Sequence, residues 1–386
     1  MKASKSNPEV AAIYCPLWHN YDHASSWKGE GWCEWELVKN SKPRFKGHHQ
    51  PFKPTWGYFD ESDPRWSEKE ISLAANHGID VFIVDWYWYS GVKIMEEALE
   101  RGLLKTKNRN RIKFALMWAN HDWADYFPAP FGQKWNSWLP SRHTQIDWNR
   151  ALDYCIENYF SQPNYWRVDG NLFFSMFDAL KPVHQLGGAK SFKRILAATN
   201  RKLAKARLPP LHLNAMVGNT DHVDELMAAG YASTTTYNLT FSGKAGPDRI
   251  DKYDDIIEAH KLLWSNMAKS ALPYLPVVTM GWDVTPRCEA NVPWPFPPAP
   301  VPTGYGDYPY GDIVVGNTPA KFRKLCEDAL DFTRKSNARP NAVVVNAWNE
   351  WTESSFLLPE KRYGTAYLKA VHETFKRSKC VTHSGG

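Results

Sequence analysis

The sequence has no long apolar run and no cysteine spacing of the kind that binds zinc. No window approaches the roughly 20 consecutive apolar residues of a membrane span, and the start MKASKSNPEVAA has no apolar segment typical of a signal peptide. The six cysteines contain no C-x-x-C pair and no spacing that suggests a disulfide framework. We therefore expect no membrane span. Localisation stays open, because removal of a signal peptide would imply the periplasm or the exterior.

Charge of one sign is not concentrated anywhere in the chain. The 47 basic and 41 acidic residues give a net charge of +6 without a Lys/Arg stripe on any one predicted helix. A nucleic-acid binder needs clustered positive charge, so that class of protein is excluded. A basic solvated surface explains the small excess, although such an excess can also steer an anionic substrate.

Short apolar runs alternate with segments of helical periodicity along the whole chain. Runs bounded by turn residues are typical of parallel strands buried on both faces, and there are eight: 11–17, 80–85, 113–118, 171–177, 211–217, 231–237, 275–280 and 342–347. Helical periodicity covers 64–77, 146–160, 190–206, 251–269, 319–335 and 363–375. Asp63-Pro64 is a helix start signal, and Gly78 and Gly230 fall where helices should end.

Eight strand–helix units predict an α/β fold, a single (β/α)8 TIM barrel over residues 1–386. A doubly wound open sheet is the alternative, but no G-x-G-x-x-G follows the first strand. The connections after the first and seventh strands, 18–63 and 283–317, are long and leave the barrel face where such enzymes build active sites. We expect them to form cleft walls. The proline run 292–302 is either a rigid spacer or, through Trp294 and Phe296, a packed part of a wall.

Polar and aromatic residues gather where the predicted strands end. Sugars present apolar C–H faces between hydroxyl groups, so flat rings beside hydrogen-bonding groups suit them. These positions predict a carbohydrate site with the following candidates: Trp18, His19, Asp85, Trp86, Trp88, Asn120, His121, Trp123, Tyr237 and Trp282.

The segment 349–353, Asn-Glu-Trp-Thr-Glu, directly follows the buried run 343–345. If the chain turns helically there, the Cβ atoms of Glu350 and Glu353 lie roughly 5 to 6 Å apart. Carboxyl groups roughly 5 to 5.5 Å apart suit glycosidases that retain anomeric configuration. We therefore predict Glu350 and Glu353 to be the catalytic pair; the alternative is that one of them forms a structural ion pair with Arg or Lys.

Five short motifs in order resemble the WbsX-like family: Gly-Trp-Cys-Glu-Trp at 31–35, His-His-Gln-Pro at 48–51, the run 80–88, Trp-Ala-Asn at 118–120 and Trp-Asn-Glu-Trp-Thr-Glu at 348–353. That family was first labelled as glycosyltransferases of polysaccharide gene clusters, and it is similar to family 99 of the glycoside hydrolases, the endo-α-mannosidases and endo-α-mannanases. The resemblance runs from about residue 11 to 370. The chain departs from it at Ser354, where the family more often has Gly.

The resemblance implies a (β/α)8 barrel, catalysis by Glu350 and Glu353, and no metal or organic cofactor. These motifs and the neighbouring positions complete the list of substrate-binding candidates: Tyr14, Glu34, Trp35, His48, His49, Gln50, Arg287, Asn349 and Trp351. In family 99 the substrate's own 2-hydroxyl is thought to attack the anomeric carbon. Carried over, Glu350 deprotonates that hydroxyl and Glu353 protonates the leaving oxygen, with net retention.

The predicted function is therefore hydrolysis of an α-linked, manno-configured or rhamnose-containing glycan by a monomer. An anionic glycan is a further hypothesis, because the long loops carry Lys28, Arg44, Lys46 and Arg287. A glycosyltransferase is the alternative, although no phosphate-binding glycine loop or D-x-D metal site is present. A non-catalytic carbohydrate-binding barrel is the third, and binding alone would not need two glutamates. A metal site at His48 and His49 is not expected, because no metal-binding spacing is present.

Overall fold

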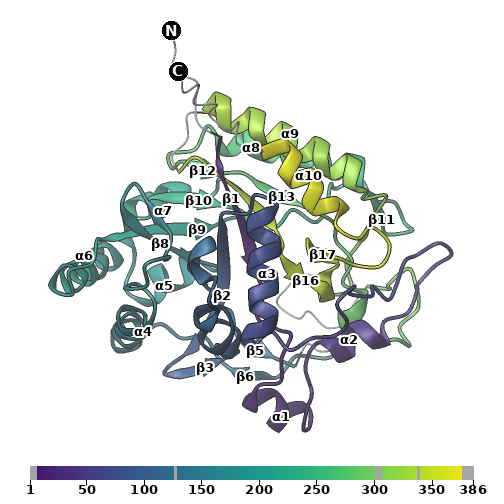
Figure 1. The fold of residues 1–386 in the computed structure, drawn as a ribbon, viewed down its shortest axis with the longest axis horizontal. Helices are drawn as coiled ribbons and strands as arrows, with labels where there is room; N and C mark the ends of the chain where they lie inside the picture. Colours follow the sequence, from purple (N-terminus) through teal and green to yellow (C-terminus); the bar gives the residue numbers. More distant parts are fainter. Residues whose placement is uncertain (1–6, 126–127, 299, 301–306, 337–339, 376–386) are drawn as a thin grey trace, which may run out of the picture.

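The computed structural model describes residues 7–125, 128–298, 300, 307–336 and 340–375, so residues 299, 301 and 302 of the proline run lie outside the described part. Figure 1 shows a central sheet with α3 (Pro64–Asn76) in front of it, α4 (Gln145–Asn158), α6 (Ala189–Lys205) and α7 (Val223–Ala229) on one side, and α8 (Tyr253–Met267), α9 (Pro319–Ser336) and α10 (Ala366–Phe375) on the other. Among the described residues, no helix is long and apolar enough to cross a membrane.

The sheet is a closed (β/α)8 barrel. Its parallel path runs β12-β10-β9-β8-β4-β2-β1-β15-β13, with these bounds: β1 (Glu9–Tyr14), β2 (Val81–Tyr89), β4 (Lys113–Trp118), β8 (Asn171–Met176), β9 (Leu211–Met216), β10 (Ser233–Thr235), β12 (Tyr274–Leu275), β13 (Val277–Thr279) and β15 (Ala342–Asn346). Only Pro276 separates β12 from β13. Because β12 pairs with β10 and β13 with β15, this interrupted strand joins the two ends of the path. The eight predicted strands and the barrel are confirmed, and the open sheet is excluded.

The strands are buried on both faces, as the apolar runs indicated. All nine residues of β2 and all six of β9 are buried. Burying a Val, Leu or Ile side chain stabilises the fold by about 1.5–3 kcal/mol, so the runs that mark strands in the sequence also form the barrel core. The side chain of Asp63 caps α3 by accepting a hydrogen bond from the amide of Arg65.

The six predicted helices are present, with ends that shift by at most a few residues. Between β2 and β4 the chain instead forms a π-helix (Ala98–Gly102) and two 3-10 helices (Leu103–Lys105 and Arg109–Arg111). The helix α7, which the sequence pattern did not reveal, ends at Gly230 with a left-handed φ of 102°.

The long connections gather at the end of the barrel where the strands finish. The first contains α1 (Asp22–Lys28) and α2 (Trp35–Asn40), and α1 lies near the hairpin of β5 (Trp123–Ala124) and β6 (Ser137–Leu139), where Trp27 packs on Trp138 (Figure 1). In the second, β14 (Ile313–Val315) pairs with β11 (Ile250–Lys252). Trp294 packs on Phe45 and on the buried Phe296. The described part of the proline run is therefore a packed wall.

Candidate active site

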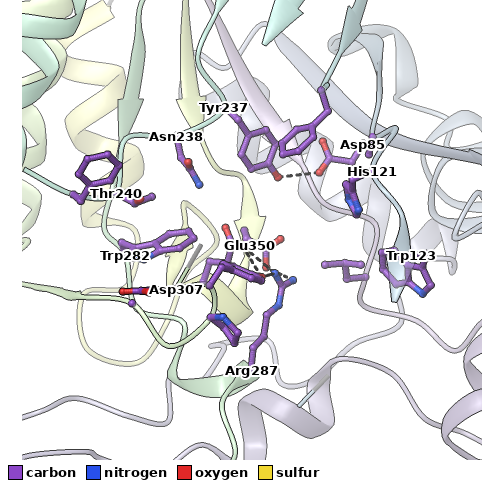
Figure 2. Close-up of a pocket in the computed structure, with 18 of the residues that line it drawn as sticks. Asp85, His121, Trp123, Tyr237, Asn238, Thr240, Trp282, Arg287, Asp307 and Glu350 are labelled. Atoms are coloured by element: carbon purple, nitrogen blue, oxygen red, sulfur yellow. Dashed lines mark hydrogen bonds and ion pairs between the residues drawn. The ribbon is translucent and has the colours of Figure 1, made fainter. Parts of the chain in front are cut away.

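A cavity of about 630 Å³ opens at the carboxyl ends of the barrel strands. Figure 2 shows Glu350 and Arg287 near its centre, with His121 and Trp123 on one side and Asn238, Thr240 and Trp282 on the other. Eight residues named from the sequence line it: Asp85, His121, Trp123, Tyr237, Trp282, Arg287, Glu350 and Glu353. Its size and mixed lining suit a small ligand or part of a glycan chain.

The segment after β15 holds the two predicted catalytic carboxyls. Glu350 lies in β16 (Asn349–Glu350), and Glu353 ends the 3-10 helix Trp351–Glu353. The Asn349 side chain accepts from the Cys15 amide at 2.8 Å and donates to the Cys15 carbonyl at 3.0 Å. These two bonds fix the segment to the end of β1. The turn is thus 3-10 helical rather than α-helical, and it brings both carboxyls to the cavity.

Ser354, the departure from the family pattern, keeps a backbone shape that favours glycine. Its φ is 57° and its ψ is 31°, in the left-handed region. The Ser354 hydroxyl donates to the Asp283 carbonyl at 2.9 Å and accepts from the Gln50 amide at 3.1 Å. These bonds offset the strain, so the turn beyond Glu353 forms without glycine.

Arg287, from the second long loop, joins three carboxyl groups. Its Nη1 donates to Glu353 Oε1 at 2.9 Å, and its Nη2 donates to Glu34 Oε2 at 3.2 Å and to Glu350 Oε1 at 3.4 Å. The ion pair that the sequence offered as an alternative is therefore present for both Glu350 and Glu353. One guanidinium cannot balance three ionised carboxylates in a buried site, so protons must remain on some of them.

Glu353 is the clearest proton carrier. Its Oε1 accepts from Arg287 and, at 3.2 Å, from the hydroxyl of Tyr308, whereas its Oε2 has no hydrogen-bond partner among the described residues. Burial, and then the charge of Glu350, raise the pKa of Glu353 to about 8. The carboxyl is therefore protonated at neutral pH, and Oε2 is the oxygen left to carry the proton.

Glu34 and Asp85 are two further buried carboxyl groups with a raised pKa. Burial raises the pKa of Glu34 to about 7, against the lowering effect of Arg287. Burial also holds the pKa of Asp85 well above its usual range, although Tyr237 donates to its Oδ2 at 2.9 Å (Figure 2). In each carboxyl the second oxygen has no partner among the described residues. Asp85 also lines the cavity, so this carboxyl is a polar group of the cavity wall.

Several lining residues were missed from the sequence. Tyr308 is the most consequential, because it contacts Glu353 and its ring lies 6.3 Å from that of Trp282. The wall also includes Tyr87, Trp135, Asn238 and Phe241. Tyr87 and Asn238 fall within strand-end clusters that the sequence does mark. Tyr308 lies in the predicted second wall, but no pattern distinguishes it from its neighbours.

Some of the predicted binding residues lie in a hydrogen-bonded layer away from the cavity. Glu61, which the sequence did not mark, is the centre of that layer. It accepts from the Trp18 amide at 2.7 Å, from Tyr14 and Asn349 at 3.0 and 3.3 Å, and contacts His19 at 3.2 Å. This layer supports the segment that carries Glu350.

The remaining candidates also do not line the cavity. His48 and Gln50 bond to Asp283 at 2.7 and 2.6 Å. The other six pack or bond elsewhere: Trp35 on Trp18, Trp86 on Trp88, Trp88 to Asp147, Asn120 to Asp178, His49 on Phe52 and Trp351 on Phe356. Among the described residues, no group of three His, Cys, Asp or Glu side chains could hold a metal ion.

The charges named for an anionic substrate are mostly engaged elsewhere. Arg44 donates to four carbonyl oxygens of residues 288–292, and the Lys28 ammonium lies over the Trp138 ring. Arg249 lines the cavity but pairs with Asp307 at 2.6 Å and Asp312 at 2.9 Å. The cavity therefore offers an anionic group little uncompensated positive charge.

Comparison with known proteins gives one matching family and a shared fold. The family model described as glycosyltransferase WbsX matches residues 10–293 and 307–371. Two curated proteins, each called uncharacterized protein WxcX and found in two strains of Xanthomonas campestris pv. campestris, are 25% identical over 387 residues. That match covers 96% of this chain and 50% of theirs, so the chain spans about half the length of these relatives.

Solved structures resemble the whole barrel at low identity. A glycoside hydrolase-like protein superposes with a TM-score of 0.65 at 14% identity, covering 97% of this chain and 95% of that one. The GH99 endo-α-mannosidase from Bacteroides thetaiotaomicron gives a TM-score of 0.58 at 14% identity, with 96% and 97% covered. At such identities these likenesses establish the fold alone.

Proposed function

The chain belongs to the family described as glycosyltransferase WbsX, and from its cavity we propose that it is a glycoside hydrolase acting on α-linked, manno-configured glycans with retention. The observation that carries this proposal is the unequal pair at the cavity. Glu353 has a pKa raised to about 8 and an oxygen without a partner among the described residues, whereas Glu350 accepts from Thr352 at 2.6 Å and from Arg287. An acid and a base held side by side are what glycosidic cleavage requires.

In the first step Glu350 accepts the proton of the substrate 2-hydroxyl, and that oxygen bonds to the anomeric carbon. The bond from this carbon to the leaving oxygen breaks, and the leaving oxygen takes the proton of Glu353. In the second step a water oxygen bonds to the anomeric carbon and loses its proton to Glu353. The bond to the 2-oxygen breaks as Glu350 returns its proton, and two displacements retain the configuration.

The rest of the cavity supports a neutral sugar chain. Trp123 and Trp282 lie on opposite sides of Glu350, and Asp85 and Asn238 offer hydrogen-bonding groups (Figure 2). Because Arg44, Arg249 and Arg287 bond to carbonyl or carboxyl groups of the protein, we propose a neutral manno- or rhamno-configured glycan rather than an anionic one. An α-linkage in these sugars places the 2-hydroxyl opposite the leaving group, as the first step requires.

Glycosyl transfer from a sugar nucleotide is the second candidate, because the family description names it. A panel of neutral and anionic polysaccharides, including mannans and rhamnose-rich chains, would be incubated with the protein, and a parallel panel would supply nucleotide sugars with acceptors. Hydrolysis products from a neutral α-linked chain that disappear in Glu353→Gln support the proposal. Products formed only in the nucleotide-sugar panel would replace it with the transferase.

A further inference from the structure

Behind the cavity, three side chains form a short hydrogen-bonded row. The hydroxyl of Thr352 lies 2.6 Å from Glu350 Oε1 and 3.0 Å from Glu34 Oε2. All three residues are buried, and Glu34, at the start of α2, does not line the cavity. Thr352 is therefore the link between the proposed base and a carboxyl that substrate cannot reach.

A threonine hydroxyl has one proton and can give it to only one of the two carboxyls. The shorter contact is with Glu350, so the longer contact with Glu34 is a hydrogen bond only if Glu34 supplies the proton. The charges in the site agree with this assignment. When Glu353 is protonated, the one positive charge of Arg287 balances the one negative charge of Glu350, so Glu34 must also be neutral.

We infer that Glu34 is a positioning residue that carries a proton and, through Thr352, keeps a hydrogen-bond donor directed at Glu350. The protonation of Glu34 does not depend on the proposed function. Its effect on the reaction rate rests on the proposed hydrolysis. The row runs from the Glu34 hydroxyl to Thr352 and from the Thr352 hydroxyl to the Glu350 carboxylate. When Glu34 loses its proton, Thr352 is drawn towards two carboxylates and Glu350 loses its dedicated donor.

The groups around Glu34 determine the pH at which it loses its proton. The titratable and charged groups that face it are Arg287, Glu350, Glu353, Tyr21 and Cys33. Burial, opposed by Arg287, raises the pKa of Glu34 to about 7, while that of Glu353 is about 8. As pH rises, activity should therefore fall in two steps, because Glu34 and Glu353 titrate as a coupled pair. The loss of the Glu34 proton should dominate the first step.

The direct test needs no substrate. Infrared spectra of the full chain would be recorded from pH 5 to 9, and the band of protonated carboxyl groups would be followed. We expect a component that disappears near pH 7, is absent in Glu34→Gln and is kept in Glu36→Gln, an exposed carboxyl on the same helix. A spectrum that is the same in wild type and in Glu34→Gln would overturn the inference.

Thr352 variants keep the test decisive if Glu34→Gln fails to fold. In the inferred row protonated Glu34 donates to Thr352, and that bond favours the protonated form, so Thr352→Val should move the infrared midpoint downward and Thr352→Ser should restore it. An unchanged midpoint in Thr352→Val would show that no such bond exists and would contradict the inference.

Activity provides a separate readout once a glycan is cleaved. Glu34→Gln keeps a donor towards Thr352 and cannot ionise, so the alkaline limb of kcat should move up by about one pH unit, from near 7 to near 8. A rate lowered equally at every pH, with the limb in place, would instead indicate a purely structural role. Absence of hydrolysis on every glycan would reject the proposed function while leaving the infrared result standing.

Discussion

At the scale of single residues, the surroundings of two glutamates three positions apart decide what each can do. Glu353 has donors on one oxygen only and a raised pKa, whereas Glu350 faces both Thr352 and Arg287. The sequence predicts the pair, because it follows a buried strand at the face where barrel sites form. It does not predict Arg287 and Tyr308 as their partners, because contacts made by a loop of more than 30 residues leave no periodic pattern.

Removing either carboxyl should abolish most turnover. We expect Glu350→Gln and Glu353→Gln each to lower kcat by at least about 10²-fold, the low end for a general acid or base. Both variants should stay folded, because each glutamine can still bond to Arg287 or Thr352. The measurement is the rate on a cleaved glycan, with Glu36→Gln as an exposed control. A folded variant that turns over at the rate of wild type would remove that glutamate from the mechanism.

Tryptophans that line the cavity should behave differently from those in the core. Trp282→Ala should weaken glycan binding more than it lowers the free energy of unfolding, because Trp282 is half-buried at the cavity wall. Trp88 is the matched control, since it is buried, bonds to Asp147 and does not line the cavity. Trp88→Ala should cost roughly 3–5 kcal/mol of stability. Glycan affinity would be measured by calorimetry and stability by urea unfolding. A Trp282→Ala protein that loses stability without losing affinity would contradict a role for this ring in glycan binding.

At the scale of elements, the sequence predicts what burial controls and misses what pairing and strain control. Strands such as β4 (Lys113–Trp118) match the prediction, because buried apolar runs mark them. β2 runs four residues further than predicted, to Tyr89, because it pairs with β3 (Val92–Ile94). The strand predicted at 275–280 is interrupted because Pro276 has no amide proton for the ladder.

The turn after Glu353 gives a prediction at this scale. Ser354→Gly removes about 1–2 kcal/mol of left-handed strain and loses hydrogen bonds worth a similar amount, so the free energy of unfolding should change little. Ser354→Ala keeps the strain and loses the bonds to Asp283 and Gln50, so it should be destabilised by about 1–2 kcal/mol. Urea denaturation would rank the two. An alanine variant at least as stable as the glycine variant would contradict this description of the turn.

At the scale of the whole molecule, buried titratable groups predict how stability depends on pH. Burial raises the pKa of Glu34, Glu70 and Glu353 to between about 7 and 8, and carboxylate partners raise that of His19 to about 9 against the effect of burial. The folded protein then binds more protons than the unfolded chain, so this stability is lost as pH rises, between about 4.5 and 8 for the acids and between 6.5 and 9 for His19.

Buried neutral histidines act in the opposite direction at lower pH. Burial lowers the pKa of His143, His212 and His260 to about 4, so their contribution grows from pH 4 and is complete by about 6.5. Above pH 6.5 these histidines add no further stability, and the buried carboxyl groups and His19 continue to lower it. The free energy of unfolding should therefore fall by at least about 1 kcal/mol between pH 6.5 and 9, and less so in Glu70→Gln. Chemical denaturation across this range would check it, and a flat or rising profile would contradict it.

The barrel joins these scales, because its strand ends and two long loops bring the proposed acid and base, Glu353 and Glu350, and the rings of Trp123 and Trp282 to one cavity. The most direct measurement of the resulting reaction is proton NMR of the first product released from an α-linked manno-configured glycan. The roles proposed for Glu350 and Glu353 predict that the α-anomer appears first and only later mutarotates. Initial release of the β-anomer would mean inversion, and would contradict both the two-step displacement and the assignment of the two carboxyls.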